Sequence, residues 1–180
     1  MNLQFGNEFS EDKGDTPSIH TKYVEETISN ININSEGIAK LLEQLNPSKA
    51  SGPDDVSARF LKETSTVISP ALALIFNASL TQHRKPDDWH KAYVTPIYKS
   101  GKRLRSKAEN YRPISLTSIP CKILEHIVHS NVMNHLDDNG ILSDAQHGFR
   151  KSRSCETQLI TLINDLAKSL NDASQLDTAL

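Results

Sequence analysis

The sequence has only two cysteines among its 180 residues and no long uninterrupted apolar run. Two cysteines, Cys121 and Cys155, cannot build the disulfide framework of a small secreted domain. No segment approaches the roughly 18 consecutive apolar residues of a membrane-spanning helix, and the first residues lack the apolar core of a secretion signal. We therefore expect an intracellular protein, cytoplasmic or nuclear, with reduced cysteines and no membrane partner.

Familiar catalytic motifs are also missing. The seven glycines are scattered singly, so there is no glycine-rich phosphate loop, and no G-x-S-x-G nucleophile motif occurs. Three pairs of adjacent acids occur, at positions 54–55, 87–88 and 137–138. Each pair lies beside a proline or at an expected helix end, where acids act as caps and turn formers. Cys121, His126 and His129 lie near one another, but a zinc site needs a fourth ligand and tighter spacing.

Charge is distributed unevenly, although the net charge is only −2. Residues 1–48 carry eight acidic against three basic side chains, whereas residues 99–153 carry ten basic against five acidic. A concentrated positive block can focus an electric field on a polyanion. Residues 1–30 are acidic and poor in large apolar side chains, so we expect a disordered leader there and a folded domain over 31–180.

The positive block begins with a segment that reads as a hairpin. Residues 92–102 and 109–116 have the aromatic and β-branched content of two strands, and Pro96 favours an edge position or a bulge. Six cations lie at the tip, opposed only by Glu109: Lys99, Lys102, Arg103, Arg105, Lys107 and Arg112. Their mutual repulsion favours binding of an anion such as a phosphate chain. From charge alone, a solvated loop is an equally good interpretation.

Periodic apolar residues predict five helices, at about 35–45, 56–64, 70–82, 118–137 and 154–170. We expect Ser35 to cap the first helix, Phe60 and Leu61 to point inward from the second, and Gly140 to end the fourth. The fourth helix is expected to bury Leu124, Ile127, Val128, Val132 and Leu136. The clearest stripe is in the last helix: Leu159, Leu162, Ile163, Leu166 and Leu170. The predicted fold class is α+β, mainly helical with one small antiparallel hairpin.

A second polar cluster, QHGFRKSRS at 146–154, places Arg150, Lys151 and Arg153 just before the last helix. Phe149 lies between these cations and Gly148. This phenylalanine is either free to stack on a base or sugar, or buried as the anchor of a loop between two helices. The sequence does not decide between these two interpretations.

Five segments follow one another in a fixed order. They are SKASGPDDVSARFLK (48–62), WHKAYVTPIYKSGK (89–102), NYRPISLTS (110–118), KILE (122–125) and LSDAQHGFR (142–150). Together they resemble the reverse transcriptases of non-LTR (LINE-type, jockey-like) retrotransposons. The resemblance covers roughly residues 35–180, and the NYRPISL segment is its most specific part.

The resemblance implies the fingers and the edge of the palm of a right-hand polymerase, which copies an RNA template from a DNA primer with dNTPs and Mg²⁺. By motif position, Lys99 would contact the triphosphate, and Arg112 would reach the phosphates while lying over the base. Loop 51–54 would pack against the path of the incoming template. Contacts to nucleic acid would come from Lys102, Arg103, Arg105, Lys107, Gln146, Gly148, Phe149 and Arg150.

The sequence departs from the family in one respect. The two palm motifs that carry the catalytic carboxylates, F-x-D-x-x-K-A-F-D and an aromatic-x-D-D core, do not occur in it. Two-metal catalysis needs carboxylates that hold Mg²⁺ ions about 3.5–4 Å apart. We therefore expect a fragment without catalytic or metal-binding residues, whose partners would include the palm and thumb of the same polyprotein.

Two alternatives stay open. Instead of a polymerase fragment, the chain could be a non-catalytic relic that binds nucleic acid, or a pseudogene product with no selected function and without a stable fold. In the latter case the stripe of the last helix would be partly exposed.

We expect the 180-residue chain alone to be unable to extend a primer, because it lacks both palm motifs. Purified chain incubated with an RNA template, an annealed DNA primer, Mg²⁺ and dNTPs should give no template-dependent incorporation. Incorporation above that of a heat-denatured sample would contradict this expectation.

Overall fold

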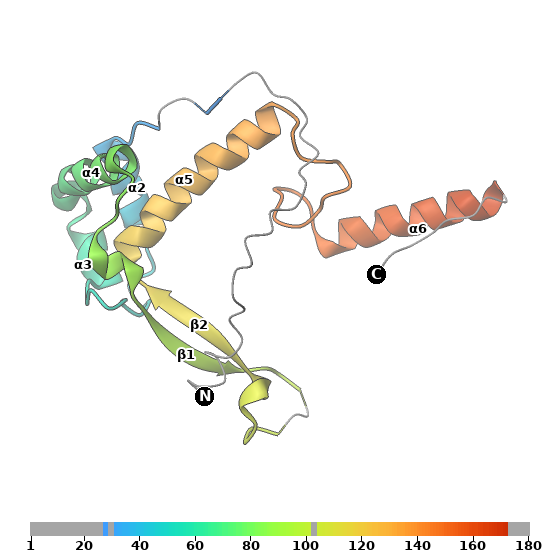
Figure 1. Cartoon of the computed structure of the whole chain (residues 1–180), viewed down its shortest axis with the longest axis horizontal. Helices are drawn as coiled ribbons and strands as arrows, with labels where there is room; N and C mark the ends of the chain where they lie inside the picture. Colours follow the sequence, from blue (N-terminus) through green and yellow to red (C-terminus); the bar gives the residue numbers. More distant parts are fainter. Residues whose placement is uncertain (1–26, 29–30, 102–103, 173–180) are drawn as a thin grey trace. The chain divides into compact units, whose positions relative to one another are not determined.

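The computed structural model describes residues 27–28, 31–101 and 104–172. Its elements, in chain order, are α2 (Ser35–Glu43), α3 (Ala58–Glu63), α4 (Ser65–Gln82), the short 3₁₀ helix η1 (Asp87–His90), β1 (Ala92–Tyr98), the 3₁₀ helix η2 (Ala108–Asn110), β2 (Tyr111–Thr117), α5 (Ile119–Asp138) and α6 (Cys155–Asn171) (Figure 1). The predicted class, mainly helical with one antiparallel hairpin, is confirmed. The expected leader over residues 1–30 lies almost entirely outside the described residues.

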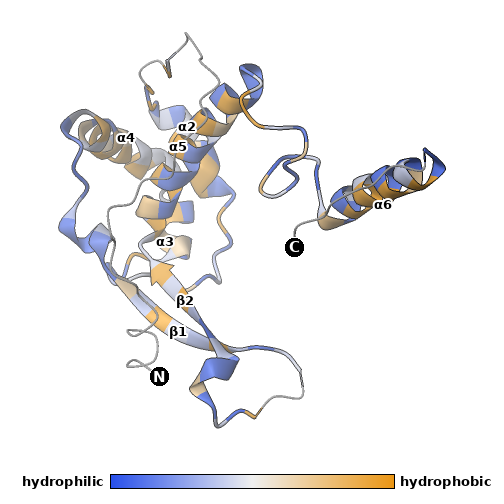
Figure 2. Cartoon of the chain, turned by 45° about the vertical axis from the view of Figure 1, so that its right-hand side comes forward, coloured by the Kyte–Doolittle hydropathy of each residue, from blue (hydrophilic) through white to orange (hydrophobic). Residues whose placement is uncertain are grey.

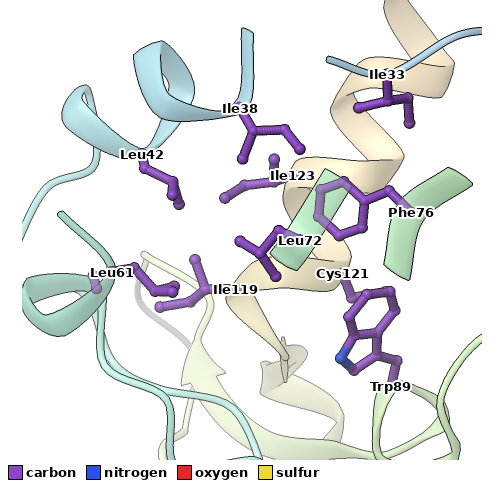
Figure 3. Packing of buried hydrophobic residues seen from close by; sticks show 11 residues of the cluster. Ile33, Ile38, Leu42, Leu61, Leu72, Phe76, Trp89, Ile119, Cys121 and Ile123 are labelled. Carbon is purple, nitrogen blue, oxygen red and sulfur yellow. The ribbon is translucent and has the colours of Figure 1, made fainter. Parts of the chain in front are cut away.

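The chain divides into two units near residue 133, and each is described by itself. In the first unit, α2, α3, α4 and the start of α5 share one apolar core (Figure 3). Its buried members are Ile33, Ile38, Leu42, Ala58, Leu61, Leu72, Phe76, Trp89, Ile119, Cys121 and Ile123. The rings of Phe76 and Trp89 meet edge to face, with centroids 5.8 Å apart. Because Trp89 lies in η1, this core also holds the segment that leads into β1.

Two helix starts differ from the sequence-based prediction. Asn34, not Ser35, caps α2, because its side chain accepts a hydrogen bond from the Gly37 N–H at 2.7 Å. Helix α4 begins at Ser65 and contains Pro70, which was expected to start it. Pro70 has no N–H for the carbonyl of Thr66, and the Ser69 hydroxyl donates to that carbonyl at 3.5 Å instead.

Burial also differs from the expected pattern at two places. Leu61 is fully buried as predicted, but the prediction for Phe60 is wrong, since 52% of its surface is exposed. In α5, the five expected core residues are only half-buried, and the buried side chains lie within the first five residues of the helix. The end of α5 is predicted correctly: Gly140 has φ +56°, and the Ile141 N–H donates to the Leu136 carbonyl at 2.9 Å.

The hairpin pairs β1 with β2 in an antiparallel register, in which Ile97 lies opposite Arg112 and Tyr98 opposite Tyr111. Pro96 lies opposite Pro113 in the same register. Hydrogen-bonded and non-hydrogen-bonded pairs alternate along such a ladder, and the Lys99 N–H donates to the Asn110 carbonyl at 2.8 Å. The two prolines therefore face each other at a non-hydrogen-bonded pair, where a missing N–H costs no ladder bond. The predicted edge position of Pro96 is confirmed, because both strands of a two-stranded sheet are edges.

In the second unit, α6 begins where the sequence predicts. Ser154 caps it by accepting from the Thr157 N–H at 3.3 Å, and the Thr157 hydroxyl accepts from the Ser154 N–H at 2.9 Å. Every residue of the predicted stripe of α6 is at least 40% exposed. Figure 2 shows the apolar residues running along this helix. No helix within the described residues is long and apolar enough to cross a membrane.

The core assignment predicts very different costs for the same substitution at two sites. Phe76→Ala should lower the free energy of unfolding by about 3–5 kcal/mol, because it opens a cavity in the core. Phe60→Ala, the matched control at a half-exposed site, should cost about 1 kcal/mol or less. Urea denaturation followed by circular dichroism measures both, and equal losses would contradict the assignment.

Candidate functional site

The strongest candidate is the tip of the hairpin, where three of the predicted cations, Lys99, Arg105 and Arg112, lie on two different faces. Paired residues of an antiparallel ladder share a face, so Arg112 lies on the same face as Ile97. Lys99 lies two positions after Ile97, and its backbone bond to Asn110 continues the ladder past the end of β1. Because side chains alternate between the faces of a strand, Lys99 is on the same face as Ile97. The Nζ of Lys99 donates to the Glu109 carbonyl at 2.8 Å, which holds this ammonium over the end of the loop.

The opposite face carries a pair of tyrosines. Tyr98 and Tyr111 meet edge to face with ring centroids 5.6 Å apart. The guanidinium of Arg105 lies 5.2 Å from the centre of the Tyr98 ring, and the Tyr111 hydroxyl donates to the Arg105 carbonyl at 3.0 Å. Arg105 is thus held on the face opposite Lys99 and Arg112. This tyrosine pair was not predicted from the sequence. Aligning the two expected strands as a hairpin would have placed Tyr98 opposite Tyr111.

The remaining cations of the tip are placed only in part. The Nζ of Lys107 lies 3.6 Å from a carboxylate oxygen of Glu109, with both side chains largely exposed. Lys102 and Arg103 lie outside the described residues.

A hollow of about 540 Å³ opens beside the tip loop. It is lined by Lys99, Leu104, Lys107, Glu109 and Asn110. Asn110 is buried, and its side-chain amide donates to the Leu104 carbonyl at 2.8 Å, so it fixes the wall of the hollow. Two ammonium groups against one carboxylate give this hollow a positive balance, which suits a phosphate group.

The second set of predicted site residues, 146–150, belongs to the other unit of the chain. Phe149 is 99% exposed, with φ +60°, so the alternative in which it is buried under the loop is wrong. A bulky residue rarely adopts this left-handed conformation, so the loop holds the backbone of Phe149 against its local preference. A Cβ added to Gly148 would meet no heavy atom within 4 Å, so space does not require a glycine there.

The arginines of this segment already have protein partners. Arg150 bonds the Asp137 carboxylate and the Ser143 carbonyl, each at 3.1 Å, and its side chain is only 16% exposed. Arg153 bonds both the carboxylate and the carbonyl of Asp144. These two arginines therefore brace the loop that carries Phe149. The Gln146 N–H donates a further bond within this loop, to the Ser143 carbonyl at 3.0 Å.

The acid pairs lie in turns and at a helix end, as the sequence predicts, and two of them also form ion pairs that were not predicted. Asp88 pairs with Lys91 at 3.0 Å, and Asp137 pairs with Arg150. Among the described residues, no three His, Cys, Asp or Glu side chains lie close enough to hold a metal ion.

A larger hollow of about 800 Å³ lies between the end of α4 and α5. Cys121 and Glu125 line it together with Arg84, Lys85 and several apolar side chains. Burial, and next the nearby Glu125 carboxylate, raise the pKa of the Cys121 thiol, so it stays protonated at neutral pH. The residues that line this hollow include both acidic and basic side chains, so its charge does not indicate a particular class of ligand.

The chain is similar in sequence to polymerases of mobile elements. It is 33% identical over 140 residues to the probable RNA-directed DNA polymerase from transposon BS of Drosophila melanogaster, a match that covers 78% of this chain and 15% of the relative. It is 30% identical over 129 residues to the RNA-directed DNA polymerase from mobile element jockey, and 27% identical over 129 residues to the probable one from transposon X-element. Both are from the same fly, and each match covers 72% of this chain and 14% of the relative. The chain thus spans about 15% of the length of the curated relatives it matches. No family model matches it.

The bracing of loop 141–154 predicts unequal effects of two neighbouring substitutions. Arg150→Ala should speed amide exchange of Gln146 and Arg153 by about 10–150-fold, because a hydrogen bond to a charged group contributes about 1.5–3 kcal/mol. Lys151→Ala, at an exposed neighbouring cation, should change these rates less than about twofold. Hydrogen exchange followed by NMR measures both, and equal effects would show that Arg150 does not brace the loop.

Proposed function

The chain is a relative of the RNA-directed DNA polymerases of non-LTR mobile elements, and we propose that its hairpin binds the triphosphate of an incoming dNTP. One observation carries the proposal: Lys99 and Arg112 share one face of the hairpin, whereas Arg105 is held on the other. This separation leaves two cations of different geometry directed to the same side.

The two cations suit different parts of a nucleotide. The ammonium of Lys99 is a compact charge beside the positive hollow, which fits a terminal phosphate. Arg112 offers a planar fork of donors to phosphate oxygens, and its flat guanidinium can lie over an aromatic base. Ile97, directly opposite Arg112 and half-exposed, adds an apolar surface beside that base. Phosphoryl transfer depends on such positioning and charge neutralisation more than on covalent chemistry.

We assign residues 31–180 to the fingers and the edge of the palm of such a polymerase. Phe149, fully exposed on a braced loop, offers a ring on which a base of the template strand can stack. Gln146 and Gly148 lie next to it, and the cations of the hairpin tip add attraction to the phosphate backbone. The carboxylates that hold Mg²⁺ would be supplied by palm motifs that do not occur in this sequence.

The proposal predicts that Lys99→Ala and Arg112→Ala each weaken dATP binding by about tenfold, since each removes a charge-assisted contact of about 1.4 kcal/mol. The charge-matched control is Lys122→Ala, at an exposed cation of α5 outside the hairpin, and it should change the affinity less than about twofold. NMR titration of the isotope-labelled chain with dATP measures all three. Equal losses in the three variants would indicate general charge attraction and would contradict a specific triphosphate site.

A further inference from the structure

Loop 51–54 packs directly on the junction between β2 and α5. Gly52 is buried there, and a Cβ added to it would lie 2.6 Å from the Ser118 nitrogen and 2.6 Å from the Thr117 carbonyl carbon. These are backbone atoms, so a side chain at Gly52 could fit only if the loop moved away from the junction. Only glycine fits at position 52, because there is no room for a Cβ atom.

A side-chain hydrogen bond joins the same two segments across 64 residues of sequence. The hydroxyl of Ser118 donates to Oδ2 of Asp54 at 2.7 Å, and Ser118 is fully buried. The same hydroxyl oxygen lies 3.5 Å from the Cys121 nitrogen in the first turn of α5. The other oxygen of Asp54 lies 3.4 Å from the Val56 nitrogen within its own loop. Asp54 therefore connects the loop to the residue that directly precedes the helix.

Ser118 is the single residue between the end of β2 and the start of α5. The hairpin projects from the helical body of its unit, and this junction is one of its two attachments (Figure 1). The other attachment is η1, where Trp89 packs on Phe76 in the core. A change at Ser118 thus alters the direction of the hairpin and, with it, the place of the tip.

We propose that loop 51–54 is a positioning latch, in which Gly52 and Asp54 hold Ser118 and so fix the angle between the hairpin and the helical body. The role of Asp54 and Gly52 in this latch is positional. They act through the position of Lys99 and Arg112, a consequence that rests on the proposed function. The neighbouring Asp55 has a separate role, because it is exposed, with φ +55°, and forms the turn itself.

The latch can be tested without any nucleotide by measuring the distance between the hairpin tip and α4. Nitroxide labels are placed at Ser106→Cys and Ala71→Cys, both exposed positions, in a chain that also carries Cys155→Ser. Double electron–electron resonance should show a narrow distance distribution for this chain. Asp54→Ala should broaden it, and Asp54→Asn should restore most of the narrow component, because an amide oxygen still accepts the Ser118 hydroxyl.

Two further variants separate positioning from folding. Gly52→Ala keeps both bonding side chains but displaces the loop, so it should broaden the distribution as Asp54→Ala does. Asp55→Asn, the matched control, should leave it unchanged. Far-UV circular dichroism of each variant should match that of the parent chain. An unchanged distance distribution in Asp54→Ala and Gly52→Ala would overturn the latch.

The dATP titration then separates the latch from the proposed function. Broadening of the distances together with an affinity loss of about threefold or more supports both. Broadening with unchanged dATP affinity supports the latch and removes its connection to nucleotide binding.

Discussion

The hairpin depends on its attachment to the core, because a two-stranded sheet has too little packing of its own to be stable in water. Both strands are largely exposed, and Tyr93, Val94 and Ile97 each leave about half of their surface uncovered. β1 enters from η1, whose Trp89 is buried in the core, and β2 leaves through the buried Ser118. The position of the cationic tip is therefore set by packing at the two ends of the hairpin.

Repulsion between the tip cations is reduced by hydrogen bonds and by their separation onto two faces. Lys99 is held by the Glu109 carbonyl, and Arg105 is held against Tyr98. These contacts lie near the surface, where each contributes little to stability on its own. Their effect is on geometry: they hold Lys99 on the face that the proposed function requires and Arg105 on the other face, while the strand register places Arg112 beside Lys99.

Local patterns predicted most of the fold. The strands, the stop at Gly140 and the start of the last helix near residue 154 follow from residue types within one turn or strand, and all are confirmed. The prediction was wrong where contacts with distant parts of the chain determine which side chain is buried. Phe60 was expected to point inward but is half-exposed, whereas its neighbour Leu61 is buried. The contact of Asp54 with Ser118 joins segments 64 residues apart and has no local signal. Phe149 could not be assigned from sequence, because exposure depends on how Arg150 and Arg153 brace its loop.

Nucleotide binding by the hairpin requires Lys99 to lie against the triphosphate. Affinity labelling with a dATP derivative that carries an amine-reactive acyl group on its terminal phosphate examines this contact itself, with peptide mass spectrometry to locate the label. Lys99 should be acylated before the other lysines of the chain, and excess dATP should protect it. Labelling spread over the lysines in proportion to their exposure, without protection by dATP, would show that the hairpin holds no triphosphate at Lys99.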